Sequence, residues 1–284
     1  MSDLLRRLLP FAIILIVSFS AVYVLENVFY CNEDNPVCLS LPPALITITD
    51  EIGNVTHVLS KNTEAAADKL SQIGTENMGD VLNNTYSDTV YAVSYGFMSP
   101  EGILEAVAPP EYADSVGLEI GKFEPAKSIL EGEAPVMTDA FTAIEGFSAV
   151  EISYPVKKAG GGYAGAVMCL AEPAEFLGNI ISPFEEEEGV SVTVMQTDGY
   201  ILYDKDLAQV GKNLFTDPFF SQYTSLVNLG HKISSKETGY GTYTFYDTSS
   251  ESKKPVKKQA HWDTVNTLGK EWRIILFKTT VSYV

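Results

Sequence analysis

Hydrophobic and polar positions change their period along the chain, and these changes divide it into three parts. A run without any charge covers residues 8–25, a period near 3.6 follows over residues 44–79, and period-two alternation begins at Val90. The 3.6 period is typical of an amphipathic helix, and alternation is typical of half-buried strands. The pattern predicts a membrane-length segment, then a long helix, then a globular part rich in strands.

The charge-free run is just long enough, at 18 residues, to cross a bilayer as a helix. Arg6 and Arg7 precede it, and such positive residues stay on the cytoplasmic side. A cleaved signal peptide is the alternative, because small residues cluster at 18–21. We expect an uncleaved anchor, since the run continues past that site. This predicts a single-pass cell-membrane protein with a cytoplasmic tip and anchor at 1–25 and an extracytoplasmic bulk.

A linker at residues 26–43 contains Cys31 and Cys38. Six intervening residues can close a small loop, so a disulfide fits an oxidising compartment, and two free thiols are the alternative. Cys169 lies in an apolar strand-like run and is expected to be buried. The spacing of cysteines and histidines suggests no metal site, and we expect no cofactor.

Residues 44–80 are expected to form one long helix of roughly 50 Å. Its apolar stripe packs either on the globular part of the same chain or on a second copy, which would give a homodimer. Both can hold along different parts of the helix. The stripe consists of Ile48, Ile52, Val55, Leu59, Ala66, Leu70 and Ile73.

The globular part repeats one order of elements, and the two copies are expected at residues 81–182 and 183–284. In each copy a turn glycine begins a strand, and a polar corner then leads to a Val-Gly pair. Such a repeat argues for two copies of one unit with a mostly antiparallel sheet. The Asp198-Gly199 pair predicts a two-residue hairpin with a primed turn. Glu185–Gly189 predicts a charged break between the copies.

Composition excludes several functions. The net charge of −18 and the pI near 4.5 repel phosphate backbones, so we expect no nucleic-acid partner. The sequence contains no G-x-S-x-G, HExxH or P-loop pattern. No catalytic residue is predicted, and we expect that the protein is not an enzyme.

Short motifs carry a resemblance to a known family, and this resemblance covers roughly residues 42–284. They are ISYPV at 152–156, the tDGyIlyDkdlaqvGKnlf stretch ending at Phe215, GYGTYTF at 239–245, AHW at 260–262 and GKEW at 269–272. In this order they resemble the double Cache (PDC-type) extracytoplasmic sensor domains of prokaryotic receptors.

The resemblance implies an α+β fold. A transmembrane helix and a long stalk helix would precede two tandem PDC/PAS-like units, each with an antiparallel sheet flanked by helices. Residues 81–182 would be the membrane-distal unit and 183–284 the membrane-proximal unit. Family ligands are small metabolites, which usually bind in the distal unit.

The sequence departs from the amino-acid-binding members of the family. Their R-x-W-Y run has no counterpart at 125–135, which contains neither Arg nor Trp. Met137-Thr138-Asp139 lacks the Tyr of their Y-x-D, and Leu170 stands where a final Asp would stand. We therefore expect no α-amino acid bound in the usual mode. The ligand class stays open between an amine and a carboxylate.

Ligand pockets are mostly apolar with a few placed polar groups. An aspartate can take an ammonium, a lysine can pair with a carboxylate, and aromatic rings can stack on a cation. In the first copy the candidates are Tyr95, Tyr112, Lys127, Asp139, Phe141, Glu151 and Tyr154. The analogous set in the second copy is Tyr203, Asp204, Tyr243, Tyr246 and His261.

These patterns lead to one expected function and one alternative. We expect a membrane-anchored sensor domain that binds a small-molecule ligand. The sequence ends after the second copy, so a separate signalling protein or a homodimer would carry the signal. The alternative is a structural protein of the cell envelope that binds no small ligand.

Overall fold

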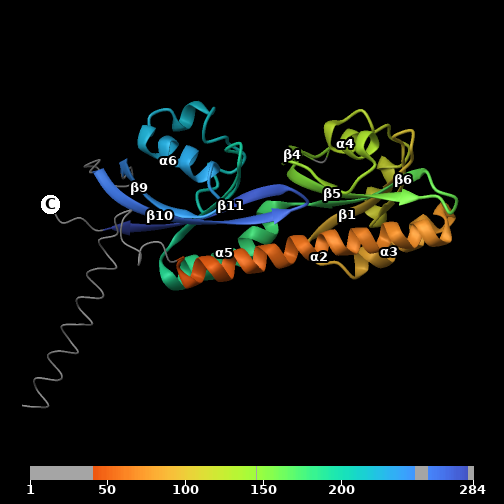
Figure 1. Ribbon diagram of the computed structural model, residues 1–284, viewed down its shortest axis with the longest axis horizontal. Coiled ribbons are helices and arrows are strands. Elements are labelled where there is room, and N and C mark those ends of the chain that lie inside the picture. Colours follow the sequence, from red (N-terminus) through yellow and green to blue (C-terminus); the bar gives the residue numbers. More distant parts are fainter. Residues whose placement is uncertain (1–40, 145, 247–254, 281–284) are drawn as a thin grey trace, which may run out of the picture.

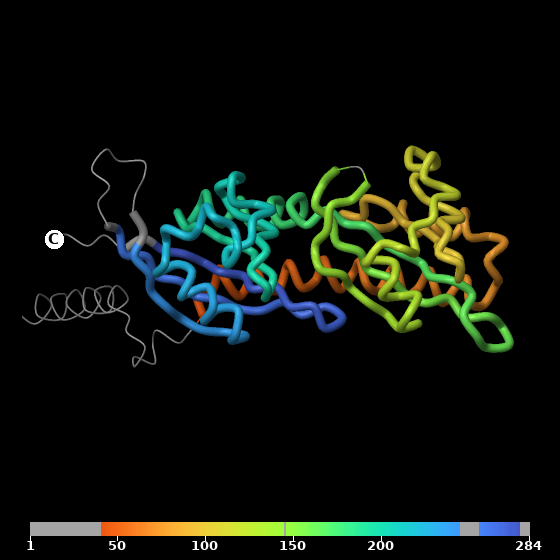
Figure 2. The backbone as a smooth tube through the Cα atoms, turned by 90° about the horizontal axis from the view of Figure 1, so that it is seen from above, coloured from red at the N-terminus to blue at the C-terminus, as the bar shows by residue number. Residues whose placement is uncertain are grey.

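The computed structural model describes residues 41–144, 146–246 and 255–280. The predicted anchor and both linker cysteines lie outside these residues. Within the described ranges, no helix combines the length and the apolar character needed to cross a membrane. The described chain is elongated, and two sheets lie one after the other along a single long helix (Figures 1 and 2).

That helix is α2 (Pro43–Ile73), and its apolar stripe packs against both sheets except at Ile73, which is exposed. It ends earlier than predicted, at Gly74, where φ is 87° and the amide donates to the carbonyl of Leu70 at 2.9 Å. Residues with a side chain rarely adopt this φ, whereas glycine adopts it readily, so Gly74 ends the helix. The chain continues through η2 (Thr75–Asn77) into a separate helix, α3 (Met78–Ser87).

The first sheet has the strand order β2-β1-β6-β5-β3, with β4 paired to β5. All its pairs are antiparallel. The long helix packs on one face, and η3 (Pro110–Ser115) and α4 (Glu124–Gly132) lie over the other (Figure 1). We call this part the first unit. Its strands are β1 (Ala92–Met98), β2 (Leu104–Ala108), β3 (Val136–Met137), β4 (Phe141–Thr142), β5 (Ser148–Lys157) and β6 (Tyr163–Ala171).

The second sheet has the order β8-β7-β11-β10-β9 and is also antiparallel. The short η4 (Pro218–Phe220) and α6 (Thr224–Ser234) belong to this second unit, and α6 lies on the face away from α2 (Figure 1). The strands are β7 (Ser191–Gln196), β8 (Ile201–Asp204), β9 (Gly239–Tyr246), β10 (Pro255–Thr267) and β11 (Lys270–Thr280). The predicted α+β class, with a long helix and two antiparallel sheets packed on helices, is confirmed.

The helix α5 (Pro173–Glu188) joins the two units and packs beside α2. The predicted charged break at 185–189 is wrong, because α5 continues to Glu188 and ends at Gly189 with φ of 62°. Glu185 is buried, and it accepts hydrogen bonds from the amide of Val192 at 2.8 Å and the hydroxyl of Tyr203 at 3.2 Å. These donors allow one glutamate of an acidic run to be buried.

The sequence repeat corresponds to a repeat of backbone hydrogen bonds. The amide of Gly117 donates to the carbonyl of Leu104 at 2.7 Å, and the amide of Gly211 donates to Ile201 at 2.9 Å. These equivalent bonds close the same polar corner in each unit. The two corners are therefore copies in three dimensions as well as in sequence.

The hairpin turn differs in type from the predicted one. The amide of Gly199 donates to the carbonyl of Gln196 at 3.0 Å, and only Gly199 of this turn has a positive φ, of 95°. This is a four-residue turn closed by a left-handed glycine, rather than a two-residue primed turn. Gly102, with φ of 81°, plays the same part in the first unit.

In the second unit, the side chain of Trp262 packs over the backbone of glycines on β9. The Trp262 indole is fully buried, and a Cβ at Gly239 would meet it directly. Its N–H donates to the carbonyl of Lys236 at 3.0 Å. The Gly-Tyr-Gly and Ala-x-Trp motifs thus have a packing role, because bare backbone on β9 leaves room for the ring on β10.

We expect Gly239→Ala to lower the free energy of unfolding by about 1–3 kcal/mol, because the added methyl overpacks the site against Trp262. Gly53→Ala is the matched control, since a Cβ at this position of α2 meets nothing within 4 Å. It should raise stability by about 0.5–1 kcal/mol. Urea unfolding of both variants measures the difference, and equal effects would contradict this packing.

Candidate ligand-binding site

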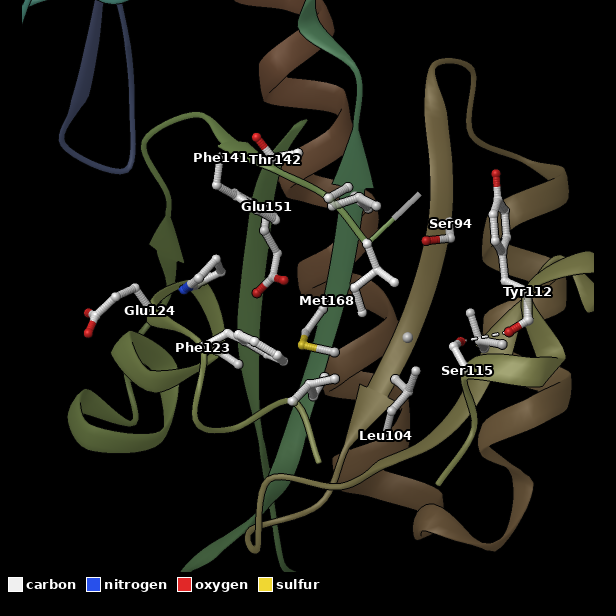
Figure 3. Close-up of a pocket in the computed structure, with 18 residues that line it drawn as sticks. Ser94, Leu104, Tyr112, Ser115, Phe123, Glu124, Phe141, Thr142, Glu151 and Met168 are labelled. Carbon is white, nitrogen blue, oxygen red and sulfur yellow. Dashed lines mark hydrogen bonds between the residues drawn. The ribbon is translucent and has the colours of Figure 1, made fainter. Parts of the chain in front are cut away.

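A cavity of about 360 Å³ lies on the face of the first sheet that is turned away from α2 (Figure 3). Successive residues of a strand point to opposite faces, so only alternate residues can reach it. They are Ser94 and Gly96 of β1, Glu151 of β5, and Met168 and Leu170 of β6. The strands and the segments above them line it with Ser94, Gly96, Leu104, Val107, Tyr112, Ser115, Ile120, Phe123, Glu124, Pro125, Ala126, Phe141, Thr142, Ala143, Ile144, Glu151, Met168 and Leu170.

A glycine on β1, Gly96, makes room for the side chains that form the floor of the cavity. A Cβ at Gly96 would lie 2.9 Å from Cδ1 of Leu104 and 3.3 Å from Cε of Met168. The bare backbone therefore allows these two side chains to converge at the bottom of the cavity. Most of the lining is apolar, which is usual for pockets that bind small organic molecules.

Glu151 is the buried ionisable group of this cavity. Its side chain comes from β5, is 8 % exposed and points toward Phe123 and Met168 (Figure 3). The hydroxyl of Ser153 donates to its Oε1 at 2.7 Å. Burial raises the pKa of Glu151 to about 7, against the opposing effect of that hydrogen bond. The cavity therefore holds a carboxyl group that changes charge near neutral pH.

The other charged side chain of the lining is Glu124, at the start of α4. Its carboxylate is turned away from the centre of the cavity in Figure 3 and lies 3.4 Å from Nζ of Lys127. Among the described residues that line the cavity there is no Lys, Arg or His. The electrostatics of the cavity thus favour a cation over an anion.

Three of the predicted site residues line this cavity, namely Tyr112, Phe141 and Glu151. Tyr95 and Tyr154 lie on the opposite face of the sheet, toward α2. The hydroxyl of Tyr95 donates to Oγ1 of Thr89 at 3.3 Å, and that of Tyr154 shares a hydrogen bond of 2.8 Å with Ser60. Both tyrosines are therefore core residues in this structure.

Lys127 and Asp139 also lie apart from the cavity lining. Lys127 is on the outer surface of α4, 3.4 Å from Glu124 and 3.9 Å from Glu131. Asp139 forms an ion pair of 2.7 Å with Lys270, at the turn between β10 and β11. The structure thus separates these two charges from Glu151, although all three belong to one unit.

Sequence reasoning missed most of the apolar lining, including Phe123, Met168 and Leu170. The pairing of β5 with β6 could have indicated part of it. Glu151 faces Leu170 directly in that register, and Ser153 faces Met168. Residues paired in this way share a face of the sheet, so Glu151 alone would have identified two lining positions.

One wall of the cavity is linked to the second unit. The lining residues 141–144 follow Ala140, whose amide donates to Oε1 of Gln196 at 2.7 Å. Ser148, where β5 begins, shares a hydrogen bond of 3.1 Å with the hydroxyl of Tyr200. Together with the Asp139 ion pair, these contacts flank the wall on both sides.

The candidates in the second unit have structural partners. Tyr203 donates to Glu185, and Asp204 accepts from the hydroxyl of Thr193. The ring of Tyr243 lies 5.6 Å from that of Phe277, and the ring of His261 lies 4.9 Å from that of Tyr240. The side chain of Tyr246 lies outside the description.

A second hollow, of about 610 Å³, lies between α2 and the turn that joins β10 to β11. Polar side chains of both elements line it, among them Asp50, His57, Lys61 and Asn266. It lacks the apolar walls of the cavity in the first unit.

Residues 55–173 match the sequence model of a family described as HK/GC/Chemotaxis protein-like, sensor domain. Over these residues the chain is similar to the sensor domains of this family. The family consists of non-catalytic, ligand-binding receptor domains, which agrees with the expectation that the protein is not an enzyme. No curated protein sequence matches the chain.

Solved structures show the fold of the sensor domain. An extracellular ligand binding receptor from Desulfohalobium retbaense DSM5692 is 26% identical with a TM-score of 0.69, and the match covers 82% of this chain but only 39% of that one. The ligand-binding domain of the Pseudomonas fluorescens chemoreceptor CtaA, in complex with L-alanine, is 17% identical with a TM-score of 0.61, covering 84% of this chain and 95% of that one.

The periplasmic sensory domain of the Campylobacter jejuni chemoreceptor Tlp1 is 12% identical with a TM-score of 0.57, covering 82% of this chain and 92% of that one. Together these matches confirm the double Cache fold of chemoreceptor ligand-binding domains.

The raised pKa of Glu151 makes the stability of the empty protein depend on pH. Between pH 4.5 and 7 the folded state binds more protons than the unfolded state. The contribution of Glu151 to the free energy of unfolding is therefore complete below pH 4.5 and is lost as the pH rises through 7. Glu151→Gln should remove a loss of about 3 kcal/mol in the free energy of unfolding over this interval.

Urea unfolding of wild type and variant at pH 4.5 and pH 8 measures this effect. The free energy of unfolding of the variant, relative to that of the wild type, should increase as the pH rises. Parallel profiles would show that Glu151 is solvated in the folded protein.

Proposed function

We propose that this sensor domain binds a small metabolite in the cavity of the first unit. The observation that carries the proposal is a mostly apolar cavity with a buried carboxyl group, Glu151, pointing into it. Burying such a group without an opposite charge beside it opposes folding, and a bound ligand offers a reason for its presence. A purely structural envelope protein gains nothing from this arrangement.

We further propose that the apolar segment 8–25 anchors the domain in the cell membrane, with the bulk of the chain outside the cell. The structures it resembles are described as an extracellular receptor and a periplasmic sensory domain. The start of α2 and the end of β11 lie together at the end of the molecule that carries the second unit (Figure 1). An anchor before α2 would therefore leave the first unit farther from the membrane.

The contacts at the cavity wall give the ligand a route to the second unit. A ligand against residues 141–144 presses on a segment whose neighbours bond to Gln196, Tyr200 and Lys270. The signal would then leave through a second copy of the chain or a separate signalling protein.

Ligand binding should raise the melting temperature of the whole 284-residue chain. Linkage gives about 2.7 kcal/mol when the free ligand is at 100 times its Kd. A metabolite library followed by differential scanning fluorimetry finds such ligands. Ser94→Phe, which places a ring in the cavity, should abolish the rise, and His57→Phe, in the second hollow, should preserve it.

If His57→Phe abolished the rise and Ser94→Phe preserved it, the ligand would bind in the second hollow. A broad library without any rise in melting temperature would contradict the proposed function.

Binding should also slow hydrogen exchange beyond the cavity. We expect protection at residues 139–144 and in β7, with no change in α6, which packs mainly against β9 at the other end of the strand order. Gln196→Ala removes the bond to Ala140 and should abolish the protection of β7 while the affinity for the ligand stays the same. Protection confined to the first unit in the wild type would contradict this route.

A further inference from the structure

We propose that the cavity binds an organic amine without a carboxylate, a monocation with an apolar body, whose ammonium pairs with Glu151. This inference rests on the proposed function, because it takes the cavity of the first unit as the ligand site. It narrows the ligand from any small metabolite to one charge class.

The charges around the cavity favour a cationic ligand. The buried ionisable group of the lining is an acid, Glu151, and the described lining residues include no cation. A carboxylate ligand would have to lose its water and find no opposite charge, which is strongly unfavourable in an apolar site. An ammonium finds its counter-ion already in place.

Lysine 127 does not supply the missing cation. It is almost half exposed, on the outer surface of α4, and it is held by Glu124 and Glu131. The first turn of α4 does border the cavity, and the start of a helix attracts anions. Here Pro125 contributes no N–H, and the carboxylate of Glu124 already lies in this turn. A ligand carboxylate therefore gains little at this end of the helix.

The uncharged part of the cavity suits the rest of an amine. Phe123, Phe141 and Tyr112 contribute aromatic side chains to the lining, and the ring of Phe123 points toward the centre, near Glu151 and Met168 (Figure 3). The face of such a ring attracts a cation, and Nζ of Lys122 already lies 5.7 Å from the centroid of the Phe123 ring. An ammonium between Glu151 and an aromatic face of the lining would be held by both. Leu104, Met168 and Leu170 form an apolar floor for the hydrocarbon part of the ligand.

Binding of such a cation requires Glu151 to be ionised. The other titratable side chains of the lining are Glu124 on α4 and Tyr112 on η3. Cys169 on β6 lies close enough to Glu151 to feel its charge. Because burial raises the pKa of Glu151 to about 7 in the empty cavity, the affinity should fall about tenfold for each pH unit below 7. Binding should release a proton to the solvent in the same interval.

Matched sets of ligands test the charge class directly. Each set keeps one hydrocarbon skeleton and changes only the charged groups: isopentylamine, leucine and 4-methylpentanoate; phenethylamine, phenylalanine and 3-phenylpropanoate; butylamine, 4-aminobutyrate and butyrate. The purified whole chain is titrated with each compound at pH 8 by calorimetry. We expect at least one amine to bind, with at least tenfold higher affinity than the amino acid and the acid of its set.

Two further measurements assign the effect to Glu151. Glu151→Gln keeps the size of the side chain and an acceptor for Ser153, and it should weaken amine binding at pH 8 at least tenfold and remove its pH dependence. Glu105→Gln, at an exposed position of β2, should leave both unchanged. The pH profile of the wild type requires no variant and stands even if Glu151→Gln fails to fold.

Three results would overturn the inference. These are tighter binding of an amino acid or acid than of its matched amine, amine affinity that does not change between pH 5 and 8, and no binding of any amine. Binding of another metabolite class that Ser94→Phe abolishes would overturn the amine assignment and leave the proposed function intact. A metabolite library without any ligand would overturn both.

Discussion

Both sheets of the protein pack on the same helix, and the rest of the structure depends on this packing. One continuous apolar core contains residues of α2, α5 and both units. Polar contacts on successive turns of the helix add to it. Thr267 of the second unit donates to Thr56 at 2.9 Å, and Ser60 bonds Tyr154 of the first unit. The helix therefore fixes the two units relative to each other and commits one face of each sheet to the core.

That commitment determines where a ligand can bind in the first unit. The face toward α2 is filled with side chains such as Tyr95 and Phe97, so only the opposite face is free to form a cavity. On that face Glu151 is held in an apolar surrounding that opposes its ionisation. An ammonium would relieve this unfavourable state. The binding energy of the ligand and the charge state of one glutamate are thus two aspects of the same interaction.

The sequence predicted the elements of the fold well, because local rules decide them. The turn glycines Gly102 and Gly199, and the period of the α2 stripe, act within a few residues of themselves. Even so, the end of α2 at Gly74 and the turn type at Gly199 were missed, since a glycine allows several backbone conformations.

The candidate site was harder to predict, because it depends on which face of the sheet each residue occupies. Tyr95 and Glu151 lie on strands of the same sheet, yet the first points to the core and the second to the cavity. Composition carries no signal for this difference. The charges of Lys127 and Asp139 suggested a role in ligand binding, but both are paired elsewhere. Lys127 pairs with Glu124 and Glu131 of the same helix. Asp139 pairs with Lys270 of the second unit.

A crystal structure of the chain grown with the tightest-binding amine tests the central claim most directly. We expect density for the ligand in the cavity of the first unit, with its nitrogen within hydrogen-bond distance of the Glu151 carboxylate and its hydrocarbon part against Met168 and Leu104. A ligand in the polar hollow beside α2, or one whose nitrogen points away from Glu151, would contradict it.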